Sequence, residues 1–161
     1  MSRTRTTTWE DPHAAAAHMQ TLSGLEALHA MASGEIPPPP IIQLLGITLT
    51  SIAPGHIVMQ LPIGEHLYNG LGTVHGGTAA TLLDSVMGCA IQSLLPRKRA
   101  FTTLELKVSY QRAITQSTGL ITAEGHSLSV GRKAGFAEGR ITDASGKLYA
   151  TASTTCAIWD L

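Results

Sequence analysis

The sequence is short of cysteine, of net charge and of long apolar runs, and each shortage excludes a class of protein. Only two cysteines, Cys89 and Cys156, occur among the 161 residues. They form no CxxC or Cys/His spacing, which argues against a disulfide framework and against a zinc site. Both lie among apolar neighbours, so we expect two small core residues and no metal centre.

The charge balance and the hydropathy exclude further partners. Lys plus Arg and Asp plus Glu both number 11, so the formal net charge is zero. Nucleic acid and anionic membrane surfaces select for basic proteins and are not expected as partners. No apolar run approaches the ~20 residues that span a bilayer. Arg3 and Arg5 are not followed by the apolar stretch of a signal peptide, so we expect a cytoplasmic protein.

The first 40 residues differ in character from the rest of the chain. Over about residues 12–33 an apolar stripe predicts one helix, carried by Met19, Leu22, Leu25, Leu28 and Ala32. Four prolines at 37–40 then form a stiff, extended spacer. The polar face of the helix is not basic, which favours packing over lipid binding. We expect an accessory helix and linker over 1–40 and one compact domain over 41–161.

The remaining pattern predicts an α+β fold. One helical turn is expected at 41–45 and a long helix over 75–94, which Pro96 terminates. Within the strand at 101–112, Leu104, Leu106, Val108 and Tyr110 are expected to share one face. One curved antiparallel sheet can wrap around the long helix, with strands expected at 46–53, 56–63, 101–112, 118–129, 133–142 and 147–159.

One acidic residue, Asp84, lies in the apolar part of the long helix with no Lys or Arg one turn away. Burying a carboxylate without a partner costs roughly several kcal/mol unless a hydrogen bond or an opposite charge compensates it. Two interpretations stay open. Asp84 is a structural carboxylate bonded to a backbone or hydroxyl group, or it faces a substrate at a subunit interface.

Gly76 and Gly77 lie where this helix begins. The first N–H groups of a helix have no partner within it and carry the positive end of the dipole. They could stabilise a carbonyl oxygen that gains negative charge, or the two glycines could simply allow a tight junction. Gly76 and Asp84 lie ~12 Å apart along the axis, so one chain cannot aim both at a single carbon atom. Two antiparallel copies of the helix could.

These residues resemble a known signature. The pattern Asn69-x5-His75-Gly76-Gly77-x6-Asp84-x3-Gly88, with the segments at 102–113 and 129–155, resembles that of hotdog-fold acyl-CoA thioesterases. The nearest branch is the PaaI-like group of the 4-hydroxybenzoyl-CoA thioesterase superfamily. The similarity covers about residues 40–158 and implies a hotdog fold, in which a curved sheet wraps a long helix. It also implies a homodimer with two interfacial sites, often paired again into a homotetramer.

The resemblance also implies roles in the hydrolysis of an acyl-CoA thioester to free acid and CoA. The Gly76 N–H would polarise the thioester carbonyl, His75 would hold the loop, and Asn69 would position the carbonyl or the water. Asp84 of the other subunit would be the general base or the nucleophile. Thr103 would orient the water. No cofactor is implied, since CoA is part of the substrate.

The phosphates of CoA need local cations because the chain as a whole is neutral. The candidate cations are Arg112 at a strand end, the turn Gly131-Arg132-Lys133 and, third, the segment 97–99, and Gly77 is also expected to contact CoA. A solvated loop is the simpler interpretation of the segment 97–99. A non-catalytic acyl-CoA sensor on the same scaffold is the alternative function, although a sensor needs neither Asp84 nor Asn69.

Overall fold

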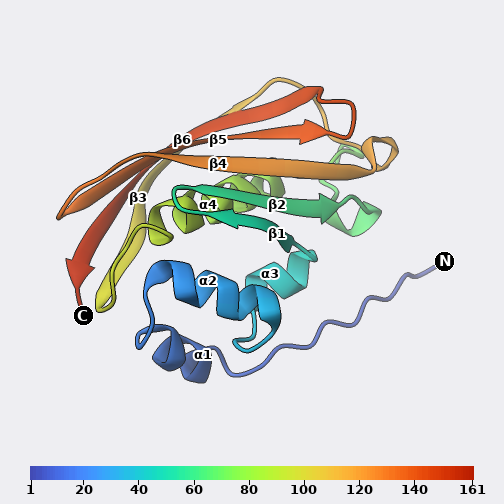
Figure 1. Ribbon diagram of the computed structural model, residues 1–161. Coiled ribbons are helices and arrows are strands. Elements are labelled where there is room, and N and C mark those ends of the chain that lie inside the picture. The colour runs from blue at the N-terminus through green and yellow to red at the C-terminus, as the bar shows by residue number, and fades with distance from the viewer.

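The computed structural model describes all residues, 1–161, and contains one sheet and four α-helices (Figure 1). The helices are α1 (Pro12–Met19), α2 (Gly24–Ser33), α3 (Pro40–Leu45) and α4 (Gly76–Gln92), with 3-10 turns at Glu65–Leu67 and Gln116–Thr118. The strands are β1 (Thr48–Ala53), β2 (His56–Pro62), β3 (Arg99–Tyr110), β4 (Leu120–Val130), β5 (Ala134–Asp143) and β6 (Leu148–Asp160).

The six strands form one antiparallel sheet in the order β1-β2-β4-β5-β6-β3. Figure 1 shows the sheet curving over α4, with α1, α2 and α3 on the side of α4 away from β5 and β6. Helix α4 is buried along most of its length, including Leu82, Leu83 and Met87. Gly125 in β4 permits this close packing, because a Cβ there would lie 2.5 Å from the Val86 carbonyl oxygen. The predicted α+β hotdog architecture is confirmed.

The N-terminal segment contains two helices, so the prediction of one helix over 12–33 is wrong. Helix α1 ends at Met19, and Ser23 begins α2 with a capping box: its Oγ accepts the Glu26 N–H at 3.3 Å, and Glu26 accepts the Ser23 N–H at 2.8 Å. A residue that caps a new helix has non-helical backbone angles and therefore interrupts the old one. Ala32, predicted to be on the apolar face, is exposed, whereas Ala27 and Leu28 are buried.

A β-bulge changes the faces of β3. The pairing of β3 with β6 shifts between Thr103 and Glu105, so Leu104 and Glu105 together occupy one step of the ladder. Leu104 is consequently 68% exposed, which corrects the prediction that it shares a face with Leu106 and Val108. The same shift leaves Thr103 half-buried on the inner face, toward α4.

The remaining boundaries differ from the predictions by a few residues. Helix α4 spans 76–92 rather than 75–94 because His75 caps it, and the helical turn expected at 41–45 is α3. Cys156 is a buried core residue as expected, but Cys89 is only partly buried. None of the helices combines the length and the hydrophobicity needed to cross a bilayer.

Candidate active site

Asp84 bonds to a hydroxyl group from the neighbouring strand. The Thr103 Oγ1 donates to Asp84 Oδ1 at 2.8 Å, and the Thr103 Oγ1 also lies 3.9 Å from Cys156 Sγ. No Lys or Arg forms an ion pair with this carboxylate, and Asp84 is half-buried. The one hydrogen bond that Asp84 accepts occupies Oδ1 and leaves Oδ2 without a partner in the chain.

Asp84 lies in the wall of a cleft with a volume of about 480 Å³, the Asp84 cleft. On the side of α4 and β3 the cleft is lined by Asp84, Ser85, Gly88, Cys89, Phe101 and Thr103. The opposite side is formed by the three N-terminal helices. A half-buried carboxylate in an apolar cleft of this size is a typical arrangement for a small-molecule site.

Cys89 also lines this cleft, but its thiol is a poor nucleophile here. Enclosure of its sulfur and, to a smaller extent, the negative charge of Asp84 together raise the pKa of the Cys89 thiol to about 12. The thiolate is the reactive form of cysteine, so a thiol held protonated at neutral pH is inert.

The loop before α4 presents a free N–H group. The His75 Nδ1 accepts the Gly77 N–H at 2.8 Å and caps the helix, while the His75 carbonyl accepts the Thr78 N–H at 2.9 Å. The Gly77 N–H is therefore engaged, whereas the Gly76 N–H donates to no group of the chain. Because His75 Nδ1 accepts this hydrogen bond, the ring proton of His75 lies on Nε2 in this arrangement.

Asn69 organises the same loop. Its Oδ1 accepts the N–H groups of Leu71 and Thr73 at 2.8 and 3.3 Å, and its Nδ2 donates to Thr73 Oγ1 at 3.0 Å. These bonds hold the loop from residue 69 to residue 73, immediately before the helix start. Asn69 thus positions the loop that carries His75 and Gly76.

The Gly76 end and the Asp84 cleft lie at different places along α4. Helix α4 runs antiparallel to β3: Tyr110 Oη donates to the Gly76 carbonyl at 2.9 Å, while Thr103 meets Asp84. A second cleft of about 300 Å³ surrounds Gly76 and is lined also by His75, Tyr110 and Arg112. The structure of one chain therefore separates the predicted site residues into two groups, one with Asp84 and Thr103 and one with His75, Gly76 and Arg112.

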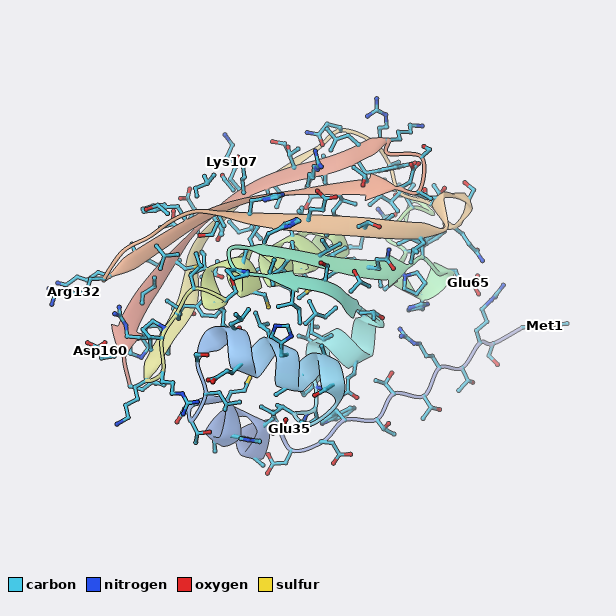
Figure 2. The ribbon with its side chains drawn as sticks, viewed as in Figure 1. Met1, Glu35, Glu65, Lys107, Arg132 and Asp160 are labelled. Atoms are coloured by element: carbon cyan, nitrogen blue, oxygen red, sulfur yellow. The ribbon has the colours of Figure 1, made fainter.

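The basic candidates divide in the same way. Arg112 lies beside Gly76, with its Nη1 donating to the Leu148 carbonyl at 2.6 Å. The turn with Gly131, Arg132 and Lys133 is exposed and lies at the opposite end of the sheet. Figure 2 shows Arg132 there, far from Glu65, which precedes the loop before α4. There the Arg99 side chain bonds to the Arg132 carbonyl. Arg112 thus lines the cleft around Gly76, and Arg99, which lines the Asp84 cleft, joins that cleft to the turn with Arg132.

The sequence indicates Arg99 only as part of the basic segment 97–99, a third candidate for the CoA phosphates for which a solvated loop is the favoured interpretation. The prediction of a solvated loop at 97–99 is wrong for this residue, because β3 begins at Arg99 and its side chain is only 17% exposed. Its Nε lies 3.0 Å from Asp160 Oδ1, and it lines the Asp84 cleft. The signal that could have found Arg99 is the alternating pattern of the strand predicted at 101–112. Had that strand been begun two residues earlier, it would have included Arg99.

A group of potential metal ligands also escaped the sequence analysis, because its members come from two strands. His56 and His126 are cross-strand neighbours with stacked rings 4.1 Å apart, and Glu124 lies beside them on the outer face of the sheet. Glu124 Oε2 already accepts from Arg140 Nη2 at 2.7 Å. A cation at this place would have to displace that ion pair.

Comparison with known proteins gives a consistent picture. The sequence profile described as "Thioesterase superfamily" matches residues 71–150. A Halobacterium salinarum protein named as an esterase is 36% identical over 103 residues, which cover 61% of this chain and 66% of that protein. Human acyl-coenzyme A thioesterase 13 is 30% identical over 105 residues, or 65% of this chain and 74% of the relative.

A solved structure agrees with these relatives. The conserved protein PA5202 from Pseudomonas aeruginosa superposes with a TM-score of 0.71 at 30% identity, over 76% of this chain and 95% of that chain. The part of the chain that the profile matches includes His75, Gly76, Asp84 and Thr103. The chain therefore belongs to the thioesterase superfamily, whose members are thioester hydrolases with the hotdog fold.

Proposed function

We propose that the protein hydrolyses acyl-CoA thioesters at sites built from two chains, with Asp84 as the general base and the Gly76 N–H as the oxyanion donor. The observation that carries the proposal is the pairing of two incomplete half-sites. One half has a carboxylate in an apolar cleft, and the other has an unpartnered N–H at a helix start. Neither half alone can both activate water and stabilise an oxyanion.

The unpaired edge of strand β3 supports the proposal that a second chain completes the site. Strand β3 is an edge strand of 12 residues, contains no proline and pairs only with β6. An exposed edge of this length is a template for pairing with another strand. A twofold axis near Leu106 and Lys107 would place Tyr110 of one protomer opposite Thr103 of its partner, and hence Gly76 of one near Asp84 of the other.

The chemistry then follows from these positions. Asp84 Oδ2 takes a proton from a water molecule while the water oxygen attacks the thioester carbon, and Thr103 holds Oδ1 so that the other oxygen faces the water. The negative charge that develops on the carbonyl oxygen is stabilised by the Gly76 N–H and the positive end of α4. The carbon–sulfur bond breaks, and the CoA thiolate leaves with the proton that Asp84 had taken. No cofactor is needed.

The cations are suited to the CoA phosphates. In the proposed dimer Arg112 lies beside Gly76 of one protomer, while Arg99, Arg132 and Lys133 lie beside the Asp84 cleft of its partner. One site therefore has basic side chains on both flanks, although the chain is neutral. Arg side chains can hold phosphate with two parallel hydrogen bonds.

Two variants test the composite site. Asp84→Ala removes the base and should lower kcat by about 10²–10⁴-fold. Gly76→Pro removes the N–H at a position where proline fits, because Gly76 is the first helical residue and His75 has φ −61° and ψ 133°. We expect a loss of about 10²–10³-fold. Gly76→Ala keeps the N–H and makes the same new contact with Tyr110, so it is the matched control.

Mixing the two inactive variants gives the decisive measurement. Half of randomly assorted dimers are hybrids with one intact site in two, so the mixture should recover about a quarter of wild-type activity. If no activity returns although native mass spectrometry shows mixed dimers, the two groups act within one chain and the proposal is wrong. A wild type that binds acyl-CoA but never hydrolyses it would identify an acyl-CoA sensor.

A further inference from the structure

The N-terminal helices form one wall of the Asp84 cleft. Ala16 and Met19 of α1, Gly24, Ala27 and Met31 of α2, and Ile42 of α3 line it. The α2 residues recur at three- and four-residue spacing and so lie on one face of the helix, opposite Asp84 and Cys89 on α4. This wall is outside the region that the superfamily profile matches.

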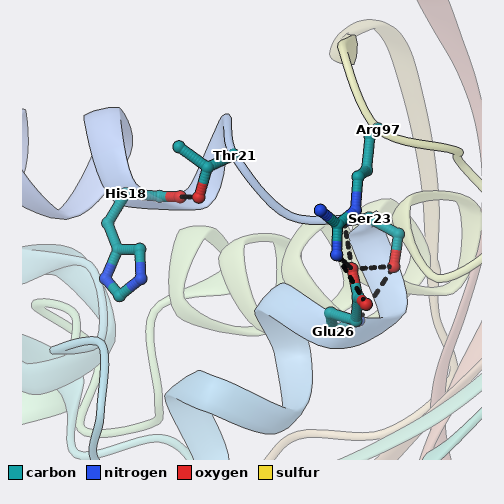
Figure 3. A network of polar contacts seen from close by, with 5 residues as sticks. All are labelled: His18, Thr21, Ser23, Glu26 and Arg97. Carbon is teal, nitrogen blue, oxygen red and sulfur yellow. Dashed lines mark hydrogen bonds and ion pairs between the residues drawn. The ribbon is translucent and has the colours of Figure 1, made fainter.

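Several contacts fix the position of α2. The Gly24 N–H donates to the Leu95 carbonyl at 3.0 Å, and Gly24 lies so close to α4 that a Cβ would be 1.7 Å from the Gln92 carbonyl oxygen. Glu26 accepts from Ser23 and from Arg97, at 2.9 Å each, as Figure 3 shows. The wall is therefore held at a defined distance from Asp84.

Behind this wall is a second, smaller cavity of about 190 Å³. It shares four lining residues with the Asp84 cleft, namely Met31, Ile42, Met59 and Cys89. It continues between α2, α3 and β1 past Leu28 and Leu49. The half-buried Met31 side chain thus lies between the cleft that holds Asp84 and an apolar space beyond it.

We propose that the cleft between α4 and the N-terminal helices is the pocket for an aliphatic acyl chain, and that Met31 sets its depth. The inference rests on the proposed function, because the chain extends into the cleft from a thioester carbon at Asp84. The hydrophobic residues of the lining are aliphatic apart from Phe101, and they include three methionines, Met19, Met31 and Met59. Unbranched methionine side chains adapt to a flexible chain.

Shortening Met31 should join the two cavities. In Met31→Ala, kcat/KM for longer acyl-CoAs should rise relative to short ones by about fourfold for each additional methylene that is buried. Met31→Leu retains most of the volume and should keep the wild-type chain-length profile. Profiles from butyryl- to palmitoyl-CoA measure the effect. An unchanged profile in Met31→Ala, or a parallel fall at every length, would overturn the role of Met31.

A second substitution should block the cleft from the side of α1. Ala16 lines the cleft and is half-buried, while its neighbour Ala17 is exposed and lines nothing. Ala16→Trp should reduce kcat/KM for long chains at least tenfold and leave acetyl- or butyryl-CoA within twofold, whereas Ala17→Trp should change neither.

The outcomes separate the two proposals. Equal losses at all chain lengths in Ala16→Trp, or a wild-type preference for benzoyl- or phenylacetyl-CoA over every aliphatic thioester, overturn the aliphatic pocket while hydrolysis stands. Absence of hydrolysis of any acyl-CoA by the wild type instead overturns the proposed function.

Discussion

Thr103 Oγ1 and Asp84 Oδ1 lie 2.8 Å apart, joined by a hydrogen bond between an edge strand and the central helix. The bond exists because the bulge after Thr103 lets the strand present this hydroxyl inward while Leu104 faces solvent. It supplies the compensation that an otherwise unpaired carboxylate requires. It also leaves the second carboxylate oxygen available to the cleft.

Removing this hydroxyl should impair turnover more than binding. Thr103→Val keeps the shape and loses a hydrogen bond to a charged group, worth about 1.5–3 kcal/mol, so kcat should fall by about 10–100-fold. Thr103→Ser restores the donor and should recover most of the activity. Steady-state kinetics of the two variants provide the measurement. Equal losses in both would assign Thr103 a packing role instead.

Cys89 should be dispensable for catalysis although it lies in the cleft with Asp84. Burial and the Asp84 charge raise the pKa of its thiol to about 12, so almost no thiolate exists at neutral pH. Cys89→Ala should keep kcat within about threefold, and iodoacetamide at pH 8 should react with Cys89 far more slowly than with an unperturbed thiol. Loss of turnover by more than a hundredfold in Cys89→Ala would contradict this expectation.

The contact between α2 and α4 should tolerate no side chain at position 24. Gly24→Ala places a methyl group where the Gln92 carbonyl oxygen lies, and over-packing of this kind costs about 1–3 kcal/mol. We expect a lower free energy of unfolding in urea and faster amide exchange over 24–33. His29→Ala changes an exposed residue of the same helix and is the control. Unchanged amide exchange over 24–33 in Gly24→Ala would show that α2 can move to accommodate the methyl group without losing stability.

The ion pair at the start of α2 should give an acid-dependent contribution to stability. Bonds from Arg97 and Ser23 lower the pKa of Glu26 to about 2 from its usual 4.5. A lowered folded-state pKa stabilises the protein above the unfolded pKa, and the effect is lost as the pH falls toward the folded one. Wild type should exceed Glu26→Gln in stability at pH 6, and the difference should vanish by about pH 2.

Urea unfolding at a series of pH values tests this expectation. Glu10→Gln, at an exposed position in the same segment, serves as the control. If the difference in the free energy of unfolding between wild type and Glu26→Gln stays constant from pH 6 to pH 2, protonation of Glu26 does not contribute to the loss of stability in acid.

The sequence predicted the architecture well because alternation and helical periodicity report burial directly. It missed the break between α1 and α2 because the apolar spacing continues across Leu22, although Ser23 and Glu26 form a capping-box pattern that marks a new helix. It missed the bulge because an extra residue in a strand depends on the partner strand. The approach of Met31 to the Asp84 cleft depends on tertiary packing that no local pattern encodes.

The glycine contact that anchors α2 has a consequence for how such a protein can diversify. In the proposed arrangement the reacting groups belong to residues 69–103, while the chain-length filter belongs to residues 16–42. Exchange of that leading segment between relatives, with the small residue at position 24 retained, would give a new substrate range without disturbing the chemistry.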